Sequence, residues 1–96
     1  MRQIEENMVE AIKREKNFSM SNTTVKVADG LLSVYLFGNC IYVRSLASGI
    51  AQFSLCGYNT VTTRSRLNAI GLNVTTRRGQ VYYNGQPISE YGNIYV

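Results

Sequence analysis

The sequence of residues 57–71 is GYNTVTTRSRLNAIG, and the rest of the chain is arranged around it. It opens with a tight turn, continues with hydroxyl side chains that suit a helix N-terminus, and closes with Gly71, a residue typical of the position just after a helix. Thr62 or Thr63 is expected to cap the helix by accepting a hydrogen bond from an early backbone N–H. Leu67 and Ile70 give the helix a short apolar face. The stretch therefore predicts a helix of about two turns that depends on packing for its stability.

Residues 23–56, upstream of this helix, alternate between apolar and polar side chains and contain three turn signals. Asp29-Gly30 and Gly38-Asn39 are typical of two-residue hairpin turns, and residues 47–49 suit a three-residue loop. The pattern predicts a four-stranded antiparallel meander from Thr23 to Cys56. The register set by these turns places six apolar pairs on one face: Val27 with Leu32, Val25 with Val34, Val34 with Val43, Leu36 with Ile41, Val43 with Phe53, and Ile41 with Leu55.

The opposite face of the predicted sheet gathers Thr24, Lys26, Ser33, Tyr35, Phe37, Cys40, Tyr42, Arg44, Gln52 and Ser54. Aromatic and basic side chains are interleaved on it, namely Lys26, Tyr35, Phe37, Tyr42 and Arg44. Such a face suits either the stacking of nucleobases or a homodimer interface, where tyrosine and arginine are enriched. The same register sets Cys40 opposite Cys56, a geometry compatible with a disulfide, although two free thiols are expected in a reducing cytoplasm.

The two ends of the chain complete the expected fold. Residues 3–16 carry Ile4, Met8, Ala11 and Ile12 at the spacing of an amphipathic helix. Residues 17–22 form a connector in this interpretation, with Phe18 and Met20 facing inward. Residues 73–77 and 80–84 predict a second hairpin with its turn at 78–79, residues 93–96 suit a short edge strand, and the order of the last ten residues stays open. The chain is thus expected to be one α+β domain over residues 1–96, with an N-terminal helix, a four-stranded antiparallel meander, a short helix and a C-terminal β-hairpin.

Composition excludes several classes of function. The chain has no histidine, so the commonest general base and the commonest metal ligand are both missing. Two cysteines are too few for a disulfide scaffold or a four-cysteine zinc site. The acidic N-terminus does not resemble a signal peptide, and no apolar run approaches the roughly 20 residues of a membrane span. We therefore expect an intracellular protein that is not an enzyme, with no metal, no cofactor and no membrane association.

The net charge of +4 is distributed unevenly. Residues 1–16 carry equal numbers of acids and bases, whereas Arg64, Arg66, Arg77 and Arg78 follow without an acid between them. Arginines in the first turns of a helix are unfavourable beside the positive end of the helix dipole, and a bound anion would reverse that effect. We expect a phosphate site formed by Thr60, Thr62, Thr63, Arg64 and Arg66, with Arg77 and Arg78 adding positive field. The alternative is structural: the threonines cap the helix, and Glu6 or Glu10 pairs with one of the arginines.

Three segments carry a resemblance to known sequences. Residues 59–69 follow a Thr-x-Thr-Thr-x-x-Arg-Leu-Asn-Ala pattern, residues 36–41 contain a Gly-Asn turn, and residues 22–25 match an Asn-Thr-x-Val element with one residue inserted. Together they resemble short proteins of unassigned function from tailed bacteriophages, from which Tyr58, in place of a more usual tryptophan, and Cys40 depart. The resemblance implies a small accessory protein of the host cytoplasm that acts on host defence or host processes. We expect it to bind a nucleotide or nucleic acid as a homo-oligomer; the alternative is an adaptor that docks its tyrosine-rich face on a host protein.

Overall fold

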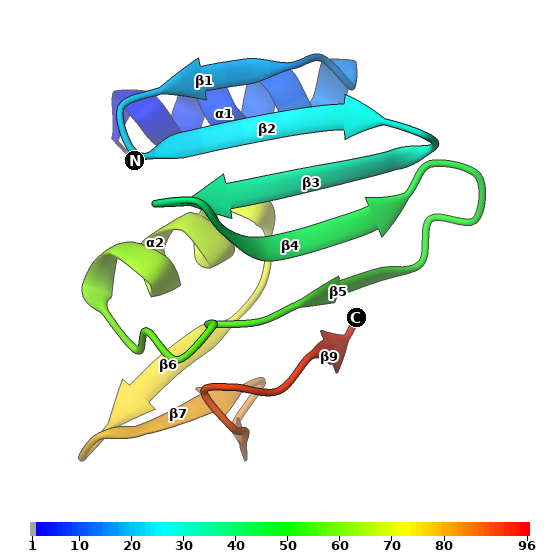
Figure 1. Ribbon diagram of the computed structural model, residues 1–96. Coiled ribbons are helices and arrows are strands. Elements are labelled where there is room, and N and C mark those ends of the chain that lie inside the picture. Colours follow the sequence, from blue (N-terminus) through cyan, green and yellow to red (C-terminus); the bar gives the residue numbers. More distant parts are fainter. Residues whose placement is uncertain (1) are drawn as a thin grey trace.

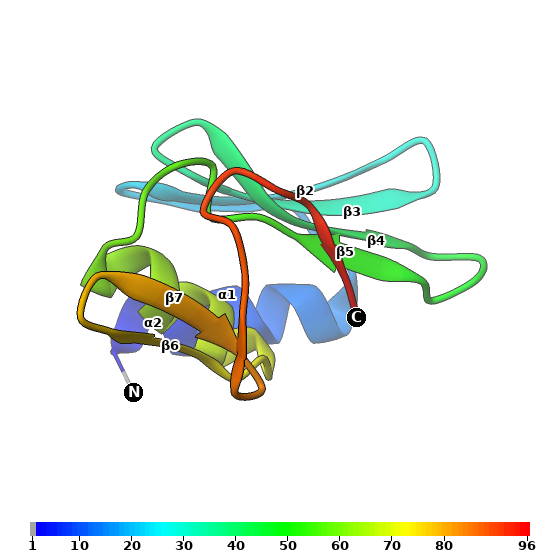
Figure 2. The same ribbon diagram turned by 90° about the horizontal axis from the view of Figure 1, so that it is seen from below.

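The structure, a computed structural model, describes residues 2–96. An antiparallel six-stranded sheet with the order β1-β2-β3-β4-β5-β9 forms one layer (Figure 1). Both helices and a smaller sheet, β6-β7-β8, lie on one face of that layer, and no part of residues 2–96 covers the opposite face (Figure 2). The helices are α1 (Gln3–Arg14) and α2 (Val61–Ile70); the strands are β1 (Phe18–Met20), β2 (Thr23–Ala28), β3 (Leu31–Leu36), β4 (Asn39–Ser45), β5 (Ala51–Phe53), β6 (Val74–Arg77), β7 (Gln80–Tyr83), β8 (Gln86–Pro87) and β9 (Ile94–Tyr95). The α+β class is confirmed, whereas the predicted meander is only part of a larger sheet.

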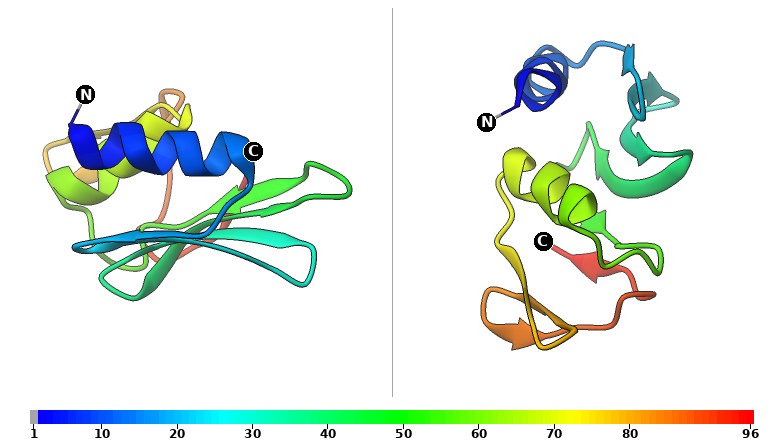
Figure 3. Two further views of the ribbon diagram at one scale, coloured as in Figure 1. Left: turned by 90° about the horizontal axis from the view of Figure 1, so that it is seen from above. Right: turned by 90° about the vertical axis from the view of Figure 1, so that its left-hand side faces the viewer.

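Helix α1 lies along the sheet with its apolar stripe turned inward, and both views of Figure 3 place it on the same side of the sheet as α2. Met8, Ala11 and Ile12 are buried, as the periodicity predicts. The first turn carries Glu5 and Glu6 and the last turn carries basic residues, an arrangement that matches the helix dipole. The helix is therefore stabilised by both its packing and its charges.

The first hairpin of the sheet has the predicted register, but the second does not. Val25 lies opposite Val34, as expected. The second turn is at Phe37-Gly38 instead of Gly38-Asn39, and a β-bulge follows, so that Val34 lies opposite Tyr42. The extra residue of the bulge buries both Ile41 and Tyr42, and the alternation of β4 is reversed beyond it.

The shifted turn and the reversed alternation overturn all four predicted pairs that involve β4, and Ile41 is not paired with Leu55 in the ladder between β4 and β5. Val34–Val43 and Leu36–Ile41 are wrong, because Leu36 lies opposite Asn39. Val43–Phe53 is wrong as well, because Phe53 lies opposite Tyr42. Phe53 nevertheless keeps its inward direction, since the partner that replaces Val43 is itself on the core face.

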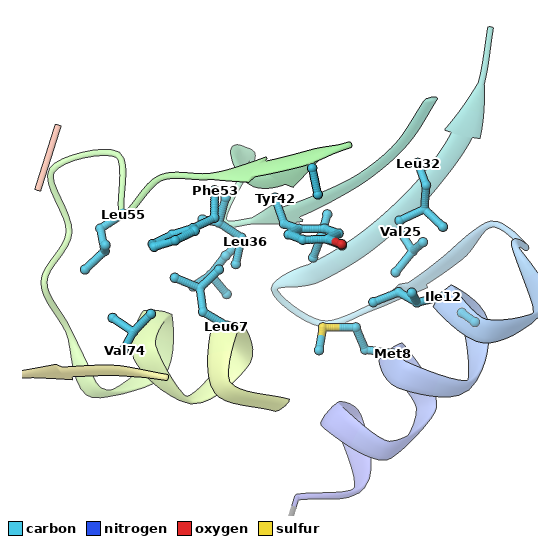
Figure 4. Close-up of a cluster of buried hydrophobic side chains, with 14 of the residues drawn as sticks. Met8, Ile12, Val25, Leu32, Leu36, Tyr42, Phe53, Leu55, Leu67 and Val74 are labelled. Carbon is cyan, nitrogen blue, oxygen red and sulfur yellow. The ribbon is translucent and has the colours of Figure 1, made fainter. Parts of the chain in front are cut away.

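The core lies between the sheet, the two helices and the small sheet (Figure 4). Leu67 of α2 is fully buried and lies close to Phe53 and Met8 in this cluster. The small sheet contributes Val74 and Val81, both almost fully buried. The remaining buried apolar residues are Ala11, Ile12, Val25, Leu32, Val34, Leu36, Ile41, Tyr42, Ala51 and Leu55. Helix α2 is short, and its position depends on this packing.

The ends of the large sheet come from segments that were expected to be irregular or uncertain. Residues 18–20 of the predicted connector form β1, in which Phe18 packs on the core but Met20 is 40% exposed. The predicted hairpin of residues 73–84 is present as β6 and β7, with its turn at residues 78–79. The chain then returns to the large sheet, where β9 pairs with β5. The C-terminal segment thus holds the small sheet to the large one.

Candidate functional site

Arg66, the centre of the predicted phosphate site, is buried between the two helices. Its side chain is only 3% exposed, and its Nη1 lies 2.8 Å from Oε2 of Glu5. Its Nε donates to the hydroxyl of Thr23 at 3.0 Å, and its Nη2 approaches the side-chain oxygen of Asn22 at 3.4 Å. Arg66 is therefore occupied by the protein itself, and it is not available to a ligand at the surface. The structural alternative holds for this arginine, with Glu5 as the partner in place of Glu6 or Glu10.

The carboxylate of Glu5 is held by more than one donor. Ser65 donates a hydrogen bond to the same Oε2 that accepts from Arg66. Burial by itself would raise the pKa of Glu5. The hydrogen bonds from Ser65 and Arg66, with a backbone hydrogen bond and the positive charge of Arg66, outweigh that effect and leave the pKa below its ordinary value. Glu5 is consequently ionised at neutral pH, and α1 and α2 are joined by a buried ion pair.

The threonines of α2 serve the helix in the first place. The N-cap is Thr60, not Thr62 or Thr63, and its hydroxyl accepts from the backbone N–H of Thr63 at 3.2 Å. The Thr63 side chain is buried and shares a hydrogen bond of 2.8 Å with Thr60. Thr62 is half-buried and has no structural role that we can identify. Two of the three predicted phosphate-binding hydroxyls thus already have partners within the helix.

The last part of the motif also has a structural role. The Asn68 side chain accepts from the backbone N–H of Val74 at 2.7 Å and donates to its carbonyl at 2.9 Å. The side-chain amide thereby forms the same pair of hydrogen bonds to Val74 that a neighbouring strand would form, and it holds β6 against α2. Gly71, at φ 119°, ends the helix in the left-handed conformation that was expected.

Arg64 faces away from Arg66, toward the small sheet. Its Nη1 donates to the side-chain oxygen of Asn59, and the Asn59 amide nitrogen donates to the Thr76 hydroxyl at 3.2 Å and to the Gly79 carbonyl at 3.5 Å. Between those two hairpin positions lie Arg77 and Arg78, both exposed. The two ion pairs among residues 2–96 are Glu10–Arg14 and Glu5–Arg66, so these three arginines carry no carboxylate partner. We call Arg64, Arg77 and Arg78 the basic corner.

A cleft of about 310 Å³ opens next to the N-terminus of α2. Its walls are Leu36, Phe37, Asn39, Ile41, Leu55, Tyr58, Thr60 and Thr63. Phe37 and Tyr58 are 73% and 55% exposed, whereas the aliphatic residues are nearly inaccessible. Sequence reasoning missed this Phe37–Tyr58 cleft because it placed Phe37 within a strand and considered Tyr58 only as part of a turn. The signal that could have found it is the pair of large aromatic residues at turns, where polar residues are usual.

The aromatic sheet face has a different composition from the one predicted. Lys26 and Tyr35 lie on the uncovered face, where they line a shallow groove with Leu31. Tyr42 is 6% exposed and belongs to the core, and Arg44 lies opposite Leu32 on the inner side. These two assignments are wrong because the bulge in β4 reverses their direction. Phe37 is in the turn and belongs to the cleft instead.

Comparison with known proteins gives one match. The model of the Kyanoviridae Gp96 protein family matches residues 1–95. The chain belongs to this family. It is thus a tailed-phage protein, as the resemblance implied. Searches of the curated proteins and of the solved structures found no significant match.

Three further features of this Gp96-family protein concern its thiols, its potential metal ligands and its helices. Cys40 and Cys56 are free thiols, and the Cys56 thiol donates to the Cys40 carbonyl at 3.1 Å. Among residues 2–96, no group of three or more potential metal-ligating side chains is present. Within the same range, neither helix is long and apolar enough to span a membrane.

Proposed function

We propose that this protein is a non-catalytic phage accessory protein that binds a phosphate-bearing ligand, a nucleotide or nucleic acid, in the host cytoplasm and thereby acts on host defence or other host processes. The observation that supports the proposal is the basic corner. Asn59 holds Arg64 and the hairpin of β6 and β7 together, and none of the three arginines in the corner is neutralised by a carboxylate.

The physical argument is that three guanidinium groups without a carboxylate partner, one on α2 and two on the hairpin that Asn59 links to it, create a positive potential. Arginine binds phosphate through two parallel N–H donors, which makes it the preferred residue for this anion. Asn59 contacts Arg64 through a neutral oxygen, so the charge of Arg64 is positioned but not cancelled. A ligand phosphate would supply the missing negative charge.

The proposed ligand site is narrower than the one expected from sequence. Arg66 and Thr63 are excluded because they are buried and hydrogen-bonded within the protein. Thr60 lines the neighbouring cleft, and its hydroxyl is shared with Thr63. Arg64, Arg77 and Arg78 therefore carry the proposal.

The test compares two double variants that remove the same charge. Arg77→Gln with Arg78→Gln removes two cations of the basic corner. Lys13→Gln with Lys16→Gln removes two exposed cations, one in the last turn of α1 and one just beyond its C-terminus. A fluorescent single-stranded DNA oligonucleotide is titrated at several salt concentrations. We expect only the arginine double variant to weaken binding strongly, and its salt slope to fall by roughly one per lost phosphate contact. Equal losses in both variants would mean that only net charge matters, and no binding by the unmodified protein would refute the proposal.

The second candidate is an adaptor that binds a host protein through the uncovered face of the large sheet. The observation that favours it is the exposure of apolar groups there: Leu31 is 45% exposed and Tyr95 is 72% exposed. Both line a groove that also contains Val43 and Gln52. Under this function Leu31→Glu abolishes salt-tolerant capture of one host protein, while the Arg77→Gln, Arg78→Gln variant retains it. The reverse pattern would reject the adaptor.

A further inference from the structure

The basic corner and the Phe37–Tyr58 cleft are separated by a single extended segment. Thr60 has extended backbone angles, φ −111° and ψ 160°, and successive side chains of an extended chain point to opposite sides. Tyr58 and Thr60 line the cleft. Asn59, between them, bonds to Arg64 and to the hairpin on the other side. The cleft and the Arg64–Asn59 contact therefore lie on either side of residues 58–60.

The cleft has the composition of a site for a planar ring. The aliphatic side chains of Leu36, Ile41 and Leu55, at most 4% exposed, form its apolar base. The exposed rings of Phe37 and Tyr58 stand at its rim. Its volume is at the lower end of the range of ligand pockets, so it suits one ring system better than a larger molecule.

Two polar groups give the cleft a means of orienting such a ring. Asn39 lines the cleft with an amide, which offers both a donor and an acceptor. Thr60 also lines the cleft, and its hydroxyl is shared with Thr63. A nucleobase combines a stacking surface with donors and acceptors on its edges, and it is the ring to which a phosphate is ordinarily attached in a cell.

The position of Phe37 is difficult to explain by stability alone. Its φ is 51°, in the left-handed region that favours glycine, asparagine and aspartate over bulky side chains. Its ring is 73% exposed, so burial offers little compensation. An exposed aromatic ring in an unfavourable backbone conformation beside an apolar cleft is understandable if the ring contacts a ligand.

From these observations we infer that the Phe37–Tyr58 cleft binds a nucleobase of the phosphate-bearing ligand, with its phosphate in the basic corner. The inference rests on the proposed function and extends it. The basic corner accounts only for the phosphate of the ligand, and the cleft accounts for its base. The ring can come from a single-stranded nucleic acid or from a free nucleotide. Stacking of a base on an aromatic side chain corresponds to roughly 5- to 150-fold in affinity.

The experiment uses the full chain and ligands that differ only in their bases. An eight-nucleotide single-stranded DNA of mixed sequence is compared with an abasic strand of the same length, and AMP and UMP are compared with ribose 5-phosphate. The informative variant is Phe37→Asn, because asparagine tolerates the left-handed conformation and the turn is retained. Tyr95→Asn, which removes an exposed ring on β9 outside the cleft, is the matched control. Circular dichroism confirms that both variants are folded.

We expect Phe37→Asn to lower the affinity for base-containing ligands at least 5-fold and to leave binding of the abasic strand unchanged, whereas Tyr95→Asn should change neither. Tight binding of AMP or UMP identifies a free nucleotide as the source of the ring; binding of the strand alone identifies nucleic acid. If Arg77→Gln with Arg78→Gln weakens binding but Phe37→Asn does not, the inference about the cleft is overturned and the proposed function stands. If the unmodified protein binds none of these probes, both are wrong. Occupation of the cleft by an apolar peptide side chain, detected as peptide binding that competes with no nucleotide, would also overturn the inference.

Discussion

Removal of the Glu5 carboxylate should destabilise this protein more than any other single charge change on α1. In Glu5→Ala the side chain of Arg66, which is 3% exposed in the unmodified protein, loses its carboxylate partner, and Ser65 loses its acceptor. Breaking one side of a buried ion pair costs about 3–5 kcal/mol, because the remaining charge is neither solvated nor paired. A small domain has a total stability of about 5–15 kcal/mol. Glu5→Ala should therefore remove a large fraction of the folding free energy.

The assay is equilibrium unfolding in urea, followed by circular dichroism. With an m-value of about 2 kcal/mol/M, a loss of about 4 kcal/mol lowers the midpoint by about 2 M. Glu6→Ala is the matched control, since Glu6 is exposed in the same helical turn and its loss should change the free energy of unfolding by less than about 0.5 kcal/mol. The double variant Glu5→Leu, Arg66→Met removes both charges together and should be more stable than Glu5→Ala.

The same pair gives a pH dependence with a defined sign. The pKa of Glu5 in the folded protein is below its ordinary value of 4.5, because the donors on its carboxylate outweigh the effect of burial. The unfolded state therefore binds the proton first, and the stabilisation by ionised Glu5 is complete above pH 4.5 and is lost as the pH falls through the lowered folded value. Accordingly, the difference in stability between the unmodified protein and Glu5→Gln should be constant above that pH and should shrink below it.

Two results would refute this reasoning. A loss in Glu5→Ala no larger than that in Glu6→Ala would mean that Glu5 is not the partner of a buried arginine. A difference between the unmodified protein and Glu5→Gln that grows toward acidic pH would mean that the folded-state pKa of Glu5 is raised instead of lowered.

Three further predictions concern neighbouring elements. Asn68→Ala leaves the backbone N–H and C=O of Val74 without their partner and should lower the free energy of unfolding by about 1–3 kcal/mol in urea titrations, whereas Asn68→Asp should keep the bond to the N–H and lose less. Gly57→Ala places a side chain at φ +82°, with its Cβ 2.7 Å from the Tyr91 ring, and should lower the melting temperature by several degrees, roughly the equivalent of 1–2 kcal/mol. Burial raises the pKa of the Cys40 thiol, with a smaller contribution from Cys56. Alkylation of Cys40 by iodoacetamide at pH 8, followed by mass spectrometry, should therefore be slower in the folded protein than in urea-unfolded protein. Equal rates would contradict this prediction.

The sequence predicts those elements of the fold that depend on local signals. The apolar spacing of Met8, Ala11 and Ile12 identifies α1, and Asp29-Gly30 sets the first hairpin correctly, because periodicity and turn chemistry act over a few residues. The predicted register of the second hairpin is wrong because the turn is shifted by only one residue and the bulge in β4 adds only one residue, and no local sequence signal marks either change. In a sheet with a period of two, the shifted turn changes the partners but keeps Cys40 on the same face as Tyr35, whereas the bulge reverses the direction of the residues beyond it. Tyr42 is the residue where this reversal matters most.

The candidate site was harder to predict because its decisive contacts are remote in sequence. Glu5 and Arg66 are 61 residues apart, and no local pattern distinguishes a buried arginine from an exposed one. Asn59 was noticed only as part of a motif, although it contacts a hairpin 17 to 20 residues downstream. Sequence reasoning treated the basic residues as one group and could not divide them between the interior and the surface.

Because Arg66 is buried and Arg64 is not, the motif of residues 59–69 has a structural role in addition to any role in binding. Arg66 contacts Thr23 and Asn22, which belong to the 22–25 segment of the resemblance to phage proteins, and the backbone carbonyl of Asn22 accepts from the N–H of Phe37, which belongs to the 36–41 segment. The three segments therefore form one structural junction, where α2 joins α1 to the sheet. In this arrangement the motif specifies a scaffold, and the proposed ligand contacts lie beside it.

The burial of Arg66 makes it unsuitable for a test of ligand binding. Arg66→Ala should lose ligand through loss of the fold, because it removes the partner of buried Glu5, and such a loss would say nothing about phosphate recognition. Arg77 and Arg78 are exposed in a hairpin turn and have no carboxylate partner, so their replacement changes the surface charge with little effect on folding. Loss of binding in the hairpin variants, with an unchanged urea midpoint, is hence the result that separates recognition from stability in this protein.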